Sequence, residues 1–368
     1  MAVASEVMYV PVDTLRRFTY QVFCGLGVPE DDAAICTEVL LASDLRGISS
    51  HGVGRLKMYY DRIRQGILSP VTRFEVVRET ETTAVVDGHH GMGHVIGYRA
   101  MELAMNKARE HGLGAVAVRN SSHFGIAGYY ALMAAREGMI GLAFTNARPS
   151  VAPTFSVEPM LGTNPIAFAC PTDEEFPFCF DAATSIAQRG KIEVLARAGK
   201  PTPAGWVIDR QGRLATDTDE ILAGIPKGLF ALLPLGGKGE ELGGHKGYGL
   251  SVVVEILCAA LQSGAFLKDL SGFDEHGNPR PHQLGHFFMA LDIGHFVPLE
   301  EFKRTAGAIL RALRAAEVSP DAERIYTAGE KAYLAEQRVR REGVPVNRAL
   351  RRNLRAMAQE LDLSGYPF

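Results

Sequence analysis

The chain is poor in cysteine and has no long apolar run, and both features exclude whole classes of protein. Its five cysteines in 368 residues form no Cys-x-x-Cys pair, so neither a disulfide framework nor a zinc knuckle is indicated. The most apolar stretch, residues 250–266, carries Glu255 and is too short to span a bilayer comfortably. The start lacks a basic segment followed by an apolar one, so no signal peptide is expected. We expect a soluble protein of the reducing cytoplasm.

Strong charge and metal-binding spacing are also missing. The net charge is −3 and 22% of residues are charged, which gives no field that would gather nucleic acid or an anionic membrane. Eleven histidines are scattered without any His-Glu-x-x-His or similar set, so no metal site is expected. A chain of this length at roughly 100–200 residues per domain favours two domains.

The order of expected elements divides the chain. Residues 12–44 have helical patterns, and a further helix is expected from Ser49 to residue 65, with Ser49 or Ser50 capping its first turn. Strands and helices then alternate until about residue 299, and the tail is helical again. This pattern predicts an α/β protein with a mixed-sheet central domain, residues 76–299. A helical domain is expected from residues 1–75, completed by residues 300–368.

The glycine-rich stretch at residues 88–97 tests whether a Rossmann nucleotide site is present. It follows an expected strand and opens a helix, but Gly91, Gly93 and Gly97 are spaced one residue too far apart for the dinucleotide fingerprint. Arg119 and Asn120 end the next strand, where an acidic residue would be needed for the ribose. An ordinary Rossmann site is therefore disfavoured.

Two serine–histidine pairs each precede an expected helix. They are Ser50–His51 and Ser122–His123, and helix N-termini suit anionic ligands. Arg55 follows His51 by four residues, so a helix that includes both would place them on one face, where a guanidinium can clamp a carboxylate beside an imidazole. A structural histidine and a surface arginine with an acidic partner remain the alternatives.

Small polar residues at expected strand ends, and one basic helix start, complete the candidate site. Glycine, hydroxyl and amide groups in such places are common at ribose and phosphate contacts. The residues concerned are Gly162, Thr163, Asn164, Asp181, Thr184 and Ser185, together with His245 and Lys246 before the long helix.

Taken in order, these segments resemble the malate/L-lactate dehydrogenase family of the second type. The matching stretches are "SDLRGISSHGVGRL", "SSHFGIAGYYALMA", "LGTNPIAFACP", "DAATSIAQRGKIE" and "GGHKGYGL", within residues 10–345. The resemblance implies a homodimer that binds NAD or NADP without a Rossmann fold. It implies catalytic roles for Ser50, His51, Arg55, His123 and Asp181. It further implies cofactor contacts from His123, Gly125, Gly162, Thr163, Asn164, Asp181, Ala183, Thr184, Ser185, His245, Lys246, Gly247, Gly329 and Glu330.

The expected activity is hydride transfer between the nicotinamide and a small 2-hydroxy or 2-keto acid. Arg55 would hold the substrate carboxylate, and either His51 or His123 would exchange the proton, with His51 favoured. Many relatives carry a serine where Ala147 stands and differ around Arg148, so Arg148 is a candidate second anion anchor and the substrate stays open. Reduction of a cyclic imine carboxylate or a diketo sugar acid, and a non-catalytic nucleotide or organic-acid binder, are the alternatives.

Overall fold

A computed structural model describes residues 7–368 of the chain, apart from the side chain of Arg197. Its centre is a seven-stranded sheet in the order β2-β3-β4-β11-β5-β6-β7, in which only β3 and β4 run parallel. The strands are β2 (Glu75–Glu79), β3 (Thr83–Asp87), β4 (Leu113–Ser121), β5 (Met139–Thr145), β6 (Ile166–Cys170), β7 (Phe178–Ala182) and β11 (Leu284–Asp292). The expected mixed α/β class is confirmed.

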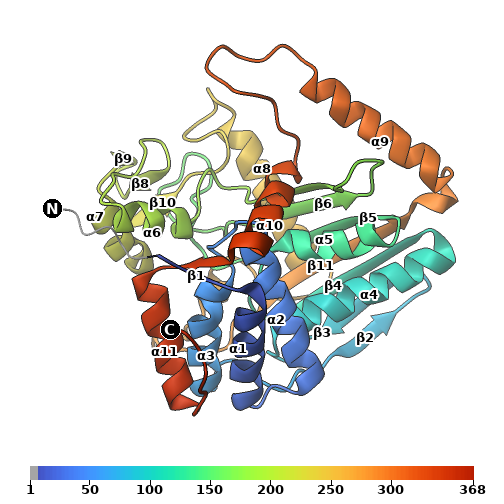
Figure 1. Cartoon of the computed structure of the whole chain (residues 1–368). Coiled ribbons are helices and arrows are strands. Elements are labelled where there is room, and N and C mark those ends of the chain that lie inside the picture. Colours follow the sequence, from blue (N-terminus) through green and yellow to red (C-terminus); the bar gives the residue numbers. More distant parts are fainter. Residues whose placement is uncertain (1–6) are drawn as a thin grey trace.

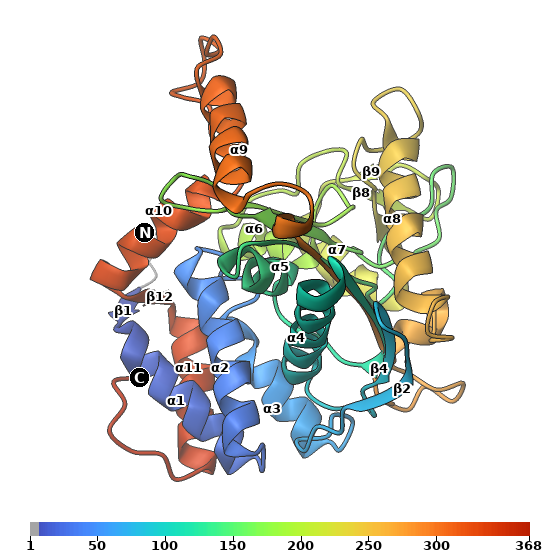
Figure 2. The ribbon, with the colours of Figure 1, turned by 90° about the vertical axis from the view of Figure 1, so that its right-hand side faces the viewer.

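Helices cover both faces of this sheet, because its strands bury side chains on both sides (Figure 2). Helices α4 (Gly93–His111) and α5 (Ala127–Arg136) pack on one face through alanines, and α8 (Gly244–Ala259) packs on the other. The α4 contact is close: a Cβ at Gly114 would lie 1.9 Å from the carbonyl oxygen of Ala104. The sheet is therefore the rigid layer from which the site loops emerge.

The two ends of the chain share a second core beside the sheet (Figure 1). Strand β1 (Met8–Val10) pairs antiparallel with β12 (Val344–Val346), and Phe18 packs edge-on against Tyr366 and Phe368. The helices that contribute side chains to this core include α1 (Val12–Gly25), α2 (Glu30–Leu45), α3 (Leu56–Arg64), α10 (Glu330–Glu342) and α11 (Arg348–Glu360). The N- and C-terminal segments thus stabilise one another, and α2 carries the contact to α4.

Two further parts complete the chain. A small sheet in the order β10-β8-β9 has its own core with α6 and α7. Its elements are β8 (Val207–Asp209), β9 (Leu214–Ala215), β10 (Phe230–Leu232), α6 (Arg189–Arg197) and α7 (Thr218–Gly224). Helix α9 (Leu299–Arg314) and the loop after it extend away from the body of the molecule (Figure 2). Within residues 7–368, no helix is long and apolar enough to cross a membrane.

Candidate active site

The loop between α2 and α3 carries the first serine–histidine pair, and a buried carboxylate holds it in place. Asp44, in the last turn of α2, accepts a hydrogen bond from the backbone N–H of Val53 at 2.7 Å. A Cβ at Gly52 would lie 2.0 Å from Oδ1 of Asp44, so only glycine fits there. Burial raises the pKa of Asp44 to about 7, against the opposing effect of the Val53 hydrogen bond.

The expected helix from Ser49 is wrong at its start. Residues 49–52 form turns, a short 3-10 helix covers Val53–Arg55, and α3 begins at Leu56 without a serine cap. His51 and Arg55 therefore do not share a helix face. They meet through Ser50: its hydroxyl lies 2.9 Å from Nδ1 of His51, and Arg55 Nε donates to its carbonyl oxygen at 2.6 Å.

His123 joins this group from the opposite side. It lies in the loop between β4 and α5, where Gly125 adopts a left-handed conformation with φ of +83°. The imidazoles of His51 and His123 are stacked, with ring centroids 5.5 Å apart and planes 18° apart. The predicted set of Ser50, His51, Arg55 and His123 is thus brought together in space.

The electrostatic surroundings of both imidazoles are cationic. Burial and the charge of Arg55 lower the pKa of His51 to about 4. Burial and neighbouring cations, among them Arg62, hold the pKa of His123 well below its usual value. Both rings are therefore neutral near pH 7, and an anion beside them would be stabilised.

The cationic region continues beyond the imidazoles. Arg62 lies two helical turns after Arg55, and its pKa is lowered by burial and by Arg148 and Arg55. Arg148 lies over the ring of Phe273 at 5.6 Å, and the surrounding protein and Arg189 lower its pKa. Burial, Arg62 and Arg148 lower the pKa of His282 to about 3. In residues 7–368, Arg55, Arg62 and Arg148 form no ion pair with a carboxylate.

A cavity of about 470 Å³ next to this group collects part of the expected cofactor set. Ile48 and Ile126 line it, and they flank the two serine–histidine loops. Asp181 on β7 accepts a hydrogen bond from the N–H of Gly128 at 2.8 Å. Gly329, with φ of +96°, packs so closely that a Cβ would lie 2.8 Å from the carbonyl oxygen of Pro177. The cationic residues of the lining are Arg46, Lys331 and Arg338.

The other expected cofactor residues lie in a second group, where most polar side chains already have partners. Thr184 donates to the carbonyl oxygens of Thr163 and Asn164, and Ser185 donates to that of Ala187. These segments adjoin the start of α8. The backbone N–H of Leu235 donates to the carbonyl oxygen of Thr184, and a Cβ built at Gly247 of α8 would lie 2.2 Å from the carbonyl oxygen of Leu235. Gly162 and Ala183 are buried in the same loops, while His245 and Lys246 are exposed.

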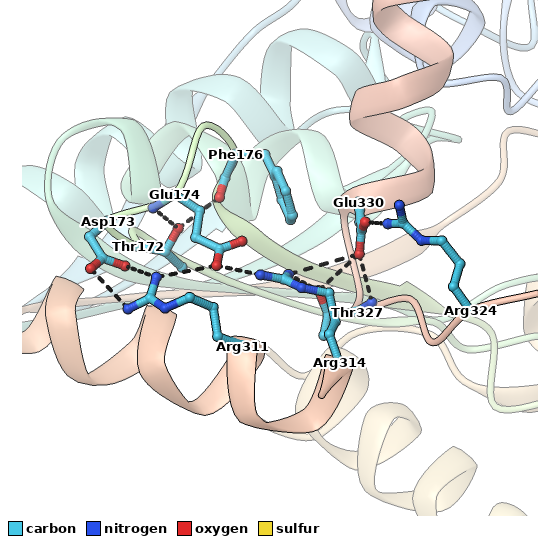
Figure 3. A network of polar contacts seen from close by, with 9 residues as sticks. All are labelled: Thr172, Asp173, Glu174, Phe176, Arg311, Arg314, Arg324, Thr327 and Glu330. Carbon is cyan, nitrogen blue, oxygen red and sulfur yellow. Dashed lines mark hydrogen bonds and ion pairs between the residues drawn. The ribbon is translucent and has the colours of Figure 1, made fainter. Parts of the chain in front are cut away.

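Asn164 and Glu330 have structural partners. The amide nitrogen of buried Asn164 donates to Glu255 of α8 at 2.8 Å. Glu330 accepts from the N–H of Thr327 and pairs with Arg314 and Arg324 (Figure 3). The same network links α9 to the residues after β6 through the pair between Arg311 and Asp173, at 2.8 Å. Glu330 therefore fastens α9 and the following loop to the start of α10, beside Gly329.

Three functional candidates were missed at the level of sequence: Asp44, Tyr59 and Arg62. Tyr59 contacts His123 Nδ1 at 2.5 Å through its hydroxyl. The signal for two of them was present, since Tyr59 and Arg62 follow Arg55 by four and seven residues and so lie on its helical face. Asp44 gave no such signal, because its partner is nine residues away across a turn. In the part of the chain that the structure describes, no group of three metal-binding side chains is found.

Comparisons with known proteins show which family the chain belongs to. The sequence profile of the malate/L-lactate dehydrogenase family matches residues 10–355. The chain is 47% identical to a malate dehydrogenase of Pyrococcus horikoshii over 97% of this chain and 96% of that protein. It is 36% identical to an L-sulfolactate dehydrogenase of Methanothermobacter thermautotrophicus over 94% of each. A crystal structure of malate dehydrogenase from Entamoeba histolytica superimposes with a TM-score of 0.96 at 44% identity, covering 99% of this chain and 100% of that one.

Proposed function

Because the chain belongs to the malate/L-lactate dehydrogenase family, we propose that it transfers hydride between NAD or NADP and a small 2-hydroxy or 2-keto acid. The chain is an oxidoreductase of hydroxy acids, as its relatives are. The observation that carries the proposal is the pair of neutral imidazoles stacked at 5.5 Å beside an arginine without a carboxylate partner. Such a site can hold a carboxylate and exchange a proton with the neighbouring oxygen.

The residues next to this pair fit a nicotinamide cofactor. The cavity of about 470 Å³ opens beside both histidine loops, and Arg46, Lys331 and Arg338 would neutralise phosphate charge. Gly128 and Gly329 let the backbone pack closely against Asp181 and Pro177, and this packing shapes the wall of the cavity. When bound, the cofactor would supply or accept the hydride. Asp181 bonds to Gly128 and to no histidine within the described residues, so we assign it to this cavity.

The chain's own residues would divide the remaining work. Arg55 would clamp the substrate carboxylate with its guanidinium nitrogens that do not bond to Ser50. His51 would exchange the proton of the substrate oxygen, with Ser50 orienting its ring. His123, facing His51, would hydrogen-bond the same oxygen. The hydrogen bond between Asp44 and Val53 holds the α2–α3 loop, and with it Ser50 and His51, in a fixed position.

We propose a dianionic substrate, of the malate type, over a monocarboxylate such as lactate. Arg62 and Arg148 add two cations beyond Arg55, and neither has a carboxylate partner in residues 7–368. A second acid group on the substrate would provide that partner, and two of the relatives are named for malate and sulfolactate. A cyclic imine carboxylate or a diketo sugar acid carries one acid group, so it would leave part of the cationic region without an anionic partner. A non-catalytic binder would not need the imidazole pair.

The proposal includes a homodimer in a reducing compartment. Helix α8 exposes an apolar row at Leu250, Val253 and Ile256, beside a cavity of about 640 Å³ that Phe266 also lines. A second copy of the chain would cover this face. All five cysteines are unpaired, which supports the cytoplasm as the compartment.

We also keep the proposed division into domains and the non-Rossmann cofactor site. The core shared by the terminal helices supports a helical unit of residues 1–75 and 300–368 beside the unit of residues 76–299, although α9 extends away from that core. A sheet with one parallel pair supports a cofactor site unlike the parallel Rossmann sheet.

The activity is tested by following the near-ultraviolet absorbance of NADH and NADPH with a panel of keto acids. We expect turnover with oxaloacetate that exceeds turnover with pyruvate and with a cyclic imine carboxylate. Binding of either nucleotide without turnover of any acid would favour the non-catalytic alternative.

A further inference from the structure

Two hydrogen-bonding groups converge on one nitrogen of His123. The hydroxyl of Tyr59 lies 2.5 Å from Nδ1, and the backbone N–H of Gly125 points to the same atom at 3.3 Å. The other ring nitrogen, Nε2, has no protein partner among the described residues and is left for a ligand. This geometry restricts where the imidazole proton can be.

The backbone amide identifies which tautomer is present, and the shorter contact, from Tyr59, holds the ring in it. An amide N–H is a permanent donor, so Nδ1 must be an acceptor and cannot carry a proton of its own. The Tyr59 phenol must then donate as well, because a lone pair of its oxygen would otherwise face the lone pair of Nδ1. A neutral His123 with an acceptor at Nδ1 carries its proton at Nε2.

Tyr59 is well placed to keep this role. Its side chain is fully buried, and its ring packs against those of Phe23 and His94, with centroids at 6.4 and 4.6 Å. Burial raises the pKa of the phenol, so it stays protonated. His94 does not compete for the phenolic proton, since neither of its ring nitrogens has a hydrogen-bond partner in the described residues.

We propose that Tyr59 is a positioning residue that fixes His123 as the Nε2–H tautomer and so makes it a hydrogen-bond donor to the substrate oxygen. The proposal rests on the proposed dehydrogenase function for its substrate. It also separates the two histidines: His123 already has a proton on Nε2 and two donors on Nδ1, so it cannot take a proton without losing those bonds. His51, whose Nδ1 faces a serine hydroxyl that can donate or accept, keeps Nε2 available as the base.

The tautomer can be read without any turnover. Histidine labelled with ¹⁵N in the ring gives different nitrogen shifts and couplings for Nε2–H and Nδ1–H forms, and a His123→Asn variant identifies the His123 signals. In the unmodified protein we expect an unprotonated Nδ1 and a protonated Nε2. A protonated Nδ1 at His123 would overturn the proposal, whether or not the protein is active.

The role of Tyr59 itself is tested by Tyr59→Phe, which keeps the buried ring and removes the hydroxyl. We expect His123 to become a mixture of tautomers, KM for the acid substrate to rise by up to about tenfold with kcat less affected, and cofactor affinity to stay unchanged. The matched control is Tyr60→Phe, because the Tyr60 hydroxyl bonds to Glu360 of α11. An unchanged His123 spectrum in Tyr59→Phe would show that Gly125 alone fixes the ring and would reject the proposal. If the unmodified protein turned over none of the acids tested, the proposed function would be rejected, and the tautomer result would still hold.

Discussion

Two buried imidazoles face each other near arginines, and burial together with these charges decides which protonation states are available. In the absence of an anion, His51, with a pKa near 4, is neutral over most of the physiological range. A bound acid group would offset Arg55 and raise the pKa of His51, so the substrate itself prepares the proton exchange. We therefore expect the proposed site to exchange a proton more readily when an anionic ligand is in place.

Replacing His51 removes the proposed proton exchanger. We expect His51→Ala to lower kcat by about 10²–10⁴-fold with cofactor still bound, because a general acid or base contributes in this range. Steady-state kinetics and fluorescence titration of the reduced cofactor measure the two quantities. His123→Ala, by comparison, should mainly raise KM; the opposite pattern would exchange the two roles.

The buried carboxyl of Asp44 makes stability depend on pH in a defined direction. Its pKa is about 7 in the folded state and near 3.8 in an unfolded chain, so the folded state binds the proton more tightly. This contribution is complete below about pH 4 and is lost as the pH rises through 7. Asp44→Asn keeps the acceptor for the Val53 N–H, so we expect it to be more stable than the unmodified protein at pH 8, by about 1–4 kcal/mol. Urea unfolding of both proteins at pH 4.5 and pH 8 tests this. If the difference between their free energies of unfolding does not grow with pH, the pKa of Asp44 is not raised.

At the scale of elements, the site depends on loops held by the ends of regular structure. The sequence predicted that Ser50, His51 and His123 would belong to one site, because each serine–histidine pair precedes a recognisable helix, and the structure brings these residues together. The sequence did not predict the start of α3, since the hydrogen bond from the Val53 N–H to Asp44 takes the place of a serine cap and leaves no local pattern. It also did not place β11, which enters the sheet between β4 and β5 from about 140 residues later in the chain.

Gly52 and Gly54 give a matched pair for testing the α2–α3 loop. A Cβ at Gly52 would overlap the carboxyl of Asp44, whereas a Cβ at Gly54 would meet only Ser49 O at 3.4 Å. Gly52→Ala should therefore displace the loop and cost at least about tenfold in kcat/KM, and Gly54→Ala should have little effect. Equal effects in the two variants would mean that Asp44 does not position Ser50 and His51.

At the scale of the whole molecule, the comparisons confirm the family resemblance that the ordered motifs indicated, and with it the oxidoreductase class. The mixed α/β class was predictable because helical and strand periodicities alternate along the chain. The cationic region was only partly predictable. Arg148 was singled out as a departure from relatives, and the spacing of Arg62 from Arg55 gave a signal that was missed. The neutral His282 lies near Arg62 and Arg148 only through the folded chain.

The apolar face of α8 predicts self-association. Light scattering should give about twice the 39.9 kDa of one chain, and Ile256→Glu should shift the protein toward the monomer by placing a charge in the contact. Val71→Glu, at an exposed apolar position outside α8, is the control. A fully active unmodified protein of monomer mass would show that this face has another use.

We propose that the cationic region around Arg55, Arg62 and Arg148 selects a hydroxy or keto acid with two acid groups. The most direct measurement is the ratio of kcat/KM for oxaloacetate to that for pyruvate, in the unmodified protein and in Arg148→Gln. We expect a ratio well above one that falls by about 10–100-fold in the variant, because a charged hydrogen bond to the second carboxylate is lost while pyruvate makes none. A ratio near one in the unmodified protein, or one that Arg148→Gln leaves unchanged, would contradict it.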